Sequence, residues 1–347
     1  MRILVYGPTS YIGEFFIREC LRRGWEVVAK VRNPVKWEII GFNEIKSKNL
    51  ITELDKIKKV DAAINFAYVQ DSPWHLVHRK TRALISSYLH DALHLSADKI
   101  IEISSLAVFG IPLKMDPVPA PLKMQYGNLY MEQKLIAERT LLFEMQTKKA
   151  IPVIIRLGNV IGPNAKSWTS NLAKLIILQM PLGNGISNST YINNIINYIC
   201  HIITTEKNYL RAFGPIHHIA EFSDYSWKDI VDKLGERLDL EPRYSEQNIK
   251  EYMEDDNNIV KNLGKYLPYI FGVLPKESVN PLVKIIYIIK SSFRIKKLDI
   301  PNISPVYFEK KQFRSYTLED WIPPFSFTEA MDNISEWLKK SGYSFFE

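Results

Sequence analysis

The residues that decide the fold stand at the N-terminus, in Arg2-Ile3-Leu4-Val5-Tyr6-Gly7-Pro8-Thr9-Ser10-Tyr11-Ile12-Gly13. The apolar first part predicts a short buried strand, the second part predicts a tight turn, and the periodicity of Phe15 to Leu21 predicts a helix. Such a turn points backbone N–H groups at the pyrophosphate of a dinucleotide. Ser10 stands where a middle glycine is usual, a departure that either weakens or reshapes the site. We expect the cofactor to contact the residues of this turn, namely Gly7, Thr9, Ser10, Tyr11, Ile12 and Gly13.

A second strand follows at the distance expected in a dinucleotide-binding unit, over Glu26-Val27-Val28-Ala29-Lys30-Val31-Arg32-Asn33-Pro34. An acidic residue at the end of this strand would bind the ribose diol, whereas Arg32 would attract a 2′-phosphate. The sequence therefore favours NADP over NAD as the cofactor. A solvated arginine at the end of a strand is the alternative interpretation.

Strands and helices continue to alternate further along the chain. Residues 61–67 and 99–104 predict strands, and the stretch from Thr81 to Leu95 predicts a helix between them. This alternation predicts an α/β fold with a doubly wound parallel sheet. His90 and His94 have the i, i+4 spacing of metal ligands on a helix, but no third ligand stands nearby, so no metal site is expected.

Three residues suited to proton transfer follow these strands. Ser105 lies in Ile103-Ser104-Ser105-Leu106-Ala107-Val108-Phe109-Gly110, and Tyr130-Met131-Glu132-Gln133-Lys134 begins twenty-five residues after Ser105. If the second segment is helical, Tyr130 and Lys134 share one face. A nearby ammonium lowers the pKa of a phenol from its usual value of about 10, toward the range in which it exchanges a proton with a substrate oxygen. The alternative is a half-buried tyrosine beside an exposed lysine.

In this order and spacing, the segments resemble the extended short-chain dehydrogenase/reductases, the NAD-dependent epimerase/dehydratase family. The resemblance runs from the glycine turn through Asn65-Phe66-Ala67 and the Ser105 segment to Tyr130-x-x-x-Lys134, and then to Arg156-Leu157-Gly158-Asn159-Val160-Ile161-Gly162-Pro163. It implies a Rossmann-type sheet with a smaller, mostly C-terminal α/β substrate domain.

The resemblance also implies roles for single residues. Tyr130 is expected to be the acid/base, Lys134 to bind the nicotinamide ribose and lower the pKa of the tyrosine, and Ser105 to hydrogen-bond the reacting oxygen. Ala67 is expected to contact the cofactor. Asn159 resembles an asparagine near the substrate phosphates, although an asparagine after a buried strand equally caps a turn. A homodimer through the helices at the Tyr-x-x-x-Lys face is a further implication.

The motifs indicate where the domains begin and end. We assign residues 1–163 to the dinucleotide-binding domain and expect residues 190–222 to return to it. Residues 164–189 and 223–347 then form the substrate-binding domain. An apolar and basic insert around 251–304 contains no motif that we recognise.

Two segments after Pro163 depart from the family pattern. Ser187 stands about where nucleotide-sugar epimerases often carry an arginine that binds the diphosphate, which counts against a sugar-nucleotide substrate. Asn193-Asn194 replaces the usual acidic pair, with an effect expected on packing or on the hinge between domains.

The leading functional interpretation is an NAD(P)-dependent oxidoreductase or epimerase acting on a carbohydrate, in particular a nucleotide sugar, as a small-molecule substrate. Dehydration is disfavoured because Leu106-Ala107 stands where 4,6-dehydratases carry an acidic pair. One alternative is an NADPH-dependent ketoreductase of a less polar substrate, supported by Arg32, Ser187 and the apolar insert. Another is a non-catalytic dinucleotide sensor, suggested by Ser10 and Asn194.

Composition excludes little beyond these classes. The chain of 347 residues is 46% hydrophobic, and its net charge of +7 comes from 45 basic against 38 acidic residues without a long basic run, so nucleic acid is not expected as a partner. Cys20 and Cys200 form neither a disulfide framework nor a zinc pattern, and no signal peptide is recognised, which favours the cytoplasm. The apolar stretch from Val279 to Leu298 contains five basic residues, so we expect a helix with its charges in solvent, and contact with a membrane surface is the alternative.

Overall fold

The computed structural model describes residues 1–31, 50–51, 57–70, 72–111, 113–125, 128–177, 181–244 and 309–341. Arg32, on which the predicted NADP preference depends, and the insert at 251–304 both lie outside these ranges. Of the helices within them, none is both long enough and apolar enough to cross a membrane.

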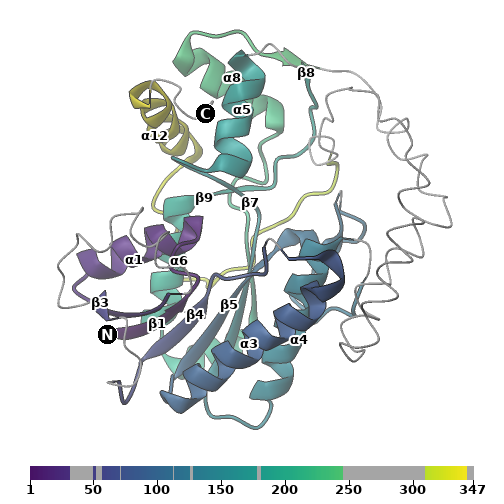
Figure 1. Cartoon of the computed structure of the whole chain (residues 1–347). Helices are drawn as coiled ribbons and strands as arrows, with labels where there is room; N and C mark the ends of the chain where they lie inside the picture. The colour runs from purple at the N-terminus through teal and green to yellow at the C-terminus, as the bar shows by residue number, and fades with distance from the viewer. Residues whose placement is uncertain are drawn as a thin grey trace, which may run out of the picture.

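A parallel sheet forms the centre of the molecule (Figure 1). Within the described residues it has seven strands in the order β10-β6-β5-β4-β1-β2-β3. The chain places β2 and β3 on one side of β1 and the later strands on the other, so the order reverses between β1 and β4. In open α/β sheets, ligands bind outside the carboxyl ends of the strands at such a switch point. The strands are β1 (Arg2–Tyr6), β2 (Glu26–Lys30), β3 (Leu50–Ile51), β4 (Ala62–Asn65), β5 (Lys99–Ser105), β6 (Ile151–Leu157) and β10 (Ile216–Ile219).

Helices cover both faces of this sheet. On one face lie α1 (Tyr11–Arg22) and α6 (Ile192–Thr204), and on the other lie α3 (Val77–His94) and α4 (Leu129–Met145). Successive side chains of a strand point to opposite faces. Ile3 of β1 accordingly belongs to the core with Phe16 of α1, whereas Leu4 belongs to the core with Ile85 of α3. The predicted doubly wound parallel sheet is thereby confirmed.

The face covered by α3 and α4 changes from apolar to polar toward the carboxyl ends of the strands. Ile100 of β5 and Ile154 of β6 belong to the apolar core on this face. Two residues further on, the same alternation places Glu102 and Arg156 there, and Asn65 ends the neighbouring β4. These three polar residues are fully buried, with at most 1% of their surface exposed. Such groups require partners within the protein, and their partners belong to the site described below.

A second group of elements lies above the sheet in Figure 1, where α5 and α8 lie beside β8. The stacked rings of Trp168 and Trp227, with centroids 5.0 Å apart, join this group internally. Nothing in the arrangement tests the predicted domain boundaries, which stay a prediction. The remaining elements are η2 (Trp74–Leu76), η3 (Leu106–Phe109), β7 (Asn159–Ile161), the π-helical turn η4 (Lys166–Ser170), α5 (Asn171–Ile177), β8 (Pro181–Leu182), β9 (Ser189–Tyr191), α7 (Lys207–Phe213), α8 (Trp227–Leu238), β11 (Arg243–Tyr244) and α12 (Phe327–Lys340).

Candidate active site

The glycine turn lies against the end of β4, at the switch point of the sheet. Gly7 has a φ of +70°, and a Cβ atom there would come within 2.6 Å of the backbone nitrogen of Ala67. A Cβ on Gly13 would overlap the carbonyl oxygen of Gly7. Both positions therefore require glycine, the first for its backbone conformation and close approach, the second so that α1 can lie directly on the turn.

Ser10 closes the turn with its side chain. Its hydroxyl accepts a hydrogen bond from the N–H of Gly13 at 3.1 Å and donates one to the carbonyl of Gly7 at 2.8 Å. Ser10 is thus the N-cap of α1, a role for which serine is among the preferred residues. The side chain that stands in place of the usual middle glycine therefore binds one of the N–H donors at the helix N-terminus.

Tyr11 joins the turn to the segment that follows β7. Its hydroxyl donates a hydrogen bond to the carbonyl oxygen of Pro163 at 2.9 Å, and burial raises the pKa of Tyr11 far above its usual value. The predicted cofactor residues Thr9 and Ile12 are partly buried beside it. The turn and the end of β7 are therefore held together at this end of the sheet.

Helix α4 presents Tyr130 and Lys134 as predicted from their spacing. The side chain of Asn128 caps the helix by accepting the N–H of Tyr130 at 2.9 Å. Tyr130 keeps 36% of its surface exposed, whereas Lys134, one turn later, keeps 4%. The ammonium of Lys134 lies 5.9 Å from the centre of the Tyr130 ring. The tyrosine of the pair is therefore open to solvent and the lysine is enclosed.

Ser105 stands at the end of β5, close in the chain to the anchor of Lys134. Its hydroxyl accepts the N–H of Ala107 at 3.2 Å and so caps η3, while Ser105 itself stays partly exposed. The Lys134 ammonium donates to the carbonyl of Ile103 at 2.7 Å, two residues before Ser105. This bond brings the lysine of α4 to the strand end that carries the serine.

Two further residues surround Lys134 that the motifs did not reveal. The ring of Tyr68 lies 5.6 Å from the ammonium and meets the Tyr130 ring edge to face, with centroids 5.4 Å apart. A carboxylate oxygen of Glu102 lies 3.8 Å from the ammonium. A signal for Glu102 was present in the sequence, because a glutamate inside the apolar strand 99–104 requires a buried partner. For Tyr68 there was no such signal.

A buried ion pair organises the segment between Ser105 and Tyr130. Arg156 of β6 binds Glu138 of α4 through two nitrogens, at 2.9 and 2.7 Å. The same guanidinium donates to the main-chain carbonyls of Val118 and Ala120, each at 3.0 Å. These carbonyls belong to a stretch in which every second residue from 117 to 121 is proline, a residue that lacks the N–H needed for a regular ladder. Arg156 therefore fixes the path of this loop.

Asn159 lies in the small parallel pair of β7 and β9. It is 9% exposed, and its amide donates to the carbonyl of Ser187 at 2.7 Å. The Ser187 hydroxyl is fully buried and bonds the hydroxyl of Ser189 at 2.9 Å and the carbonyl of Phe222. The contacts of Asn159 described here are with the backbone, and its predicted role beside the substrate stays a prediction.

Asn194, where the resemblance implies an acid, contacts a buried carboxylate and a main-chain segment. Its amide donates to a carboxylate oxygen of Glu221 at 2.9 Å and to the carbonyl of Phe325, and its oxygen accepts the N–H of Phe325 at 3.0 Å. Burial raises the pKa of Glu221. An amide can donate to this carboxylate, whereas a second acid would repel it.

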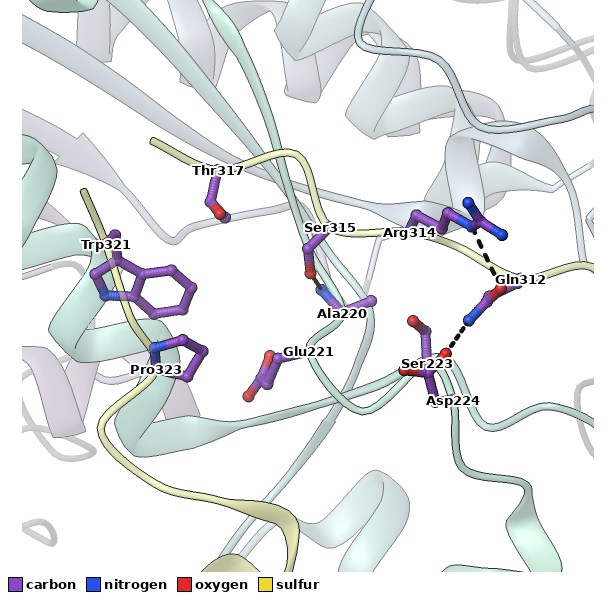
Figure 2. Close-up of a pocket in the computed structure, with 10 residues that line it drawn as sticks. All are labelled: Ala220, Glu221, Ser223, Asp224, Gln312, Arg314, Ser315, Thr317, Trp321 and Pro323. Atoms are coloured by element: carbon purple, nitrogen blue, oxygen red, sulfur yellow. Dashed lines mark hydrogen bonds between the residues drawn. The ribbon is translucent and has the colours of Figure 1, made fainter. Parts of the chain in front are cut away.

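Glu221 also lines a cavity of about 450 Å³ at the end of β10 (Figure 2). Trp321 and Pro323 stand on one side of it, and Arg314 and Gln312 stand on the other. Ser105, Tyr130 and Lys134 do not line this cavity. It is therefore a hollow distinct from the candidate active site.

The described ranges contain no group of three histidine, cysteine, aspartate or glutamate side chains that could hold a metal ion. The rings of His90 and His94 stack on the surface of α3 with centroids 6.2 Å apart.

Comparisons with known proteins show to which family the chain belongs. Residues 3–195 match the sequence model of the NAD dependent epimerase/dehydratase family. An uncharacterized protein of Schizosaccharomyces pombe is 26% identical over 257 residues, which cover 69% of this chain and 81% of that protein.

Solved structures share the fold at low identity. UDP-glucose 4-epimerase of Thermotoga maritima, with UDP-glucose, has a TM-score of 0.61 at 13% identity and covers 98% of this chain and 99% of its own. For dTDP-glucose 4,6-dehydratase of Bacillus anthracis, in complex with NAD, the TM-score is 0.59 at 15% identity, with 98% and 97% covered. A mutant of UDP-glucuronic acid 4-epimerase of Bacillus cereus is in complex with UDP-4-deoxy-4-fluoro-glucuronic acid and NAD. Its TM-score is 0.57 at 20% identity, and the match covers 71% of this chain and 85% of that protein.

The family match confirms the resemblance read from the motifs. It extends over more than half of the 347 residues, from β1 to the start of α6. The chain therefore belongs to the NAD dependent epimerase/dehydratase family.

Proposed function

We propose that this protein is an NAD(P)-dependent oxidoreductase or epimerase that acts on a carbohydrate, in particular a nucleotide sugar, with Tyr130 as the acid/base. One observation carries the proposal. The Lys134 ammonium lies 5.9 Å from the Tyr130 ring and is bound to the strand end that carries Ser105. A fixed cation beside a partly exposed phenol favours phenolate and so suits proton transfer to and from a substrate oxygen.

The glycine turn fits a dinucleotide. Gly7 and Gly13 allow the turn to pack closely against Ala67 and against the start of α1, where a Cβ atom would meet backbone atoms. In helix geometry the N–H groups of Tyr11 and Ile12, the first residues of α1, have no intrahelical acceptor, so they are donors for a phosphate. When bound, the nicotinamide supplies or accepts a hydride. Ala67, against which Gly7 packs, would line the same site.

Each catalytic side chain then has one task. The Tyr130 phenol moves the proton on the substrate oxygen, Ser105 hydrogen-bonds that oxygen, and Lys134 binds the nicotinamide ribose and keeps the phenol acidic. The partial exposure of Tyr130 and the enclosure of Lys134 support this division. Asn159 would contact the substrate.

NADP is the cofactor that Arg32 favours. The solved relatives from Bacillus anthracis and Bacillus cereus are named with NAD, so the two observations point to different cofactors. Denaturing the purified protein and identifying any released nucleotide by mass spectrometry separates them, together with titration of the native protein by NADPH and NADH. Tightly retained NAD would support an epimerase that recycles its hydride and would contradict the interpretation of Arg32.

A ketoreductase of a less polar substrate is the second candidate, and Ser187 favours it. Its buried hydroxyl bonds Ser189 and a main-chain carbonyl, so this position offers no cation to a diphosphate. A reductase consumes NADPH in proportion to product, whereas an epimerase leaves the total reduced cofactor unchanged. If no turnover is found, and Tyr130→Phe leaves both cofactor binding and biological activity unchanged, a non-catalytic sensor becomes the better description.

A further inference from the structure

Glu102 is a buried acid that the proposed chemistry does not use. It lies in the interior of β5 between Ile101 and Ile103 and has 1% of its surface exposed. Burial of a carboxylate is costly unless charge and hydrogen bonds compensate it. An apolar residue would fill this strand position without that cost, so the partners of Glu102 indicate what the acid does.

The contacts of Glu102 lead to Lys134. One carboxylate oxygen accepts the amide of Asn65 at 2.7 Å. The other has no hydrogen-bond partner in the described part of the chain and lies 3.8 Å from the Lys134 ammonium. Asn65 is itself fixed, because its oxygen accepts the N–H of Ala67 at 3.0 Å.

The other charged and titratable groups around Glu102 are committed elsewhere. Glu138, one turn beyond Lys134 on α4, is bound by Arg156 at 2.7 Å. Tyr88 of α3 donates its hydroxyl to the carbonyl of Ile101 at 2.8 Å. Lys134 is therefore the cation that the carboxylate of Glu102 faces.

We infer that Glu102 is a positioning residue of the active site, whose carboxylate holds the Lys134 ammonium and offsets part of its electric field at the Tyr130 phenol. The inference rests on the proposed function, because it adds Glu102 to the proposed action of Lys134 on Tyr130. Lys134 donates to the Ile103 carbonyl, faces Glu102 at 3.8 Å and lies 5.9 Å from the Tyr130 ring. The ammonium thus lies between a buried acid of the sheet and a partly exposed phenol.

Burial raises the pKa of Glu102 to about 7, against the opposing effect of Lys134. Glu102 is therefore ionised over the alkaline range in which a phenol titrates. In that range its negative charge disfavours phenolate, and removal of the charge leaves the full field of the ammonium on Tyr130.

The test is the titration of Tyr130 in the whole protein carrying Glu102→Gln. Gln keeps the shape of the side chain and an oxygen for Asn65, and removes the charge. The readout is the ring-carbon chemical shift of isotope-labelled tyrosine, with the Tyr130 signal assigned by its loss in Tyr130→Phe. We expect ionisation of Tyr130 to move to lower pH by on the order of one unit.

Glu132→Gln is the matched control. Glu132 is equally buried, at 1% exposed, but its carboxylate bonds His78 at 2.6 Å. We expect a much smaller shift of Tyr130 in this variant. An unchanged titration in Glu102→Gln, a shift to higher pH, or equal shifts in both variants would overturn the inference. Since the readout needs no substrate, its result is independent of whether turnover is found.

Discussion

The ammonium of Lys134 donates a hydrogen bond to the carbonyl oxygen of Ile103 at 2.7 Å, and this bond joins α4 to β5 inside the protein. Its acceptor is a main-chain atom of an interior strand of the sheet, so the bond holds the charge beside a rigid part of the fold. A lysine on an exposed helix face would instead sample many rotamers. The location of the cation is therefore set by the packing of α4 against β5.

Tyr130 and Tyr68 lie at similar distances from this cation, and we expect only Tyr130 to be essential. Tyr130→Phe should lower turnover about 10²–10⁴-fold, the usual loss when a general acid/base is removed. Dinucleotide affinity, measured by calorimetry, should be retained. The ring of Tyr68 has its centre 5.6 Å from the same ammonium. Tyr68→Phe removes an equivalent hydroxyl and should have a much smaller effect on turnover. Comparable losses in both variants would contradict the assignment of the acid/base to Tyr130.

Gly7 offers a test of the dinucleotide site with an internal control. Gly7→Ala should weaken dinucleotide binding and lower stability, because a Cβ atom there would meet Ala67 and the backbone has a φ of +70°. Gly24 has a φ of +71°, but a Cβ atom there would have no neighbour within 4 Å. Gly24→Ala should therefore cost only the backbone strain, about 1 kcal/mol, and leave binding intact. Equal affinity for dinucleotide in the two variants would place the cofactor elsewhere.

Asn194 and Glu221 should show strong coupling in a double-mutant cycle. Asn194→Asp replaces a donor by a second carboxylate beside Glu221, and we expect the free energy of unfolding to fall by about 2–4 kcal/mol. Adding Glu221→Gln should recover much of that loss, because the new amide can donate to the aspartate. Denaturant unfolding of the two single variants and the double variant measures the coupling. Additive losses would show that the two side chains do not interact in solution.

Stability should depend on pH through Glu102. Burial raises its pKa from 4.5 to about 7, so the folded protein holds this proton to higher pH than the unfolded chain does. The contribution to stability is complete below pH 4.5 and is lost as pH rises through about 7, by about 3 kcal/mol at most. Glu102→Gln lacks this term, so its stability relative to the parent should rise over the same range.

Comparison with the parent is needed because other groups act in the opposite direction. Burial lowers the pKa of His217 to about 4 and that of His218 to about 3. Their contribution is present above the usual histidine pKa and is lost as pH falls. Both histidines are present in both proteins, so their effect cancels in the difference. A difference that does not vary with pH would mean that Glu102 does not titrate in this range.

The sequence revealed those parts of the site that depend on neighbours in the chain. The glycine turn and the Tyr130–Lys134 pair are local patterns, and periodicity was sufficient to predict the parallel sheet. The contact of Glu102 with Lys134 depends on which face of β5 the glutamate occupies and on how α4 packs against that face. A sequence motif contains neither piece of information. Asn194 was visible as a departure, but its partner Glu221 follows 27 residues later and was brought to it by β10. Ser10 was ambiguous because only the turn geometry shows where its hydroxyl points.

The hydrogen bonds of Arg156 to the loop before α4 determine which substitutions this loop can tolerate. The guanidinium binds the loop through the main-chain oxygens of Val118 and Ala120, and these atoms are present whatever side chains stand there. The loop can therefore exchange its side chains without losing its anchor, whereas Arg156 and Glu138 cannot change independently of each other. The position of Tyr130, at the start of α4, should therefore depend little on which side chains stand at positions 118 and 120.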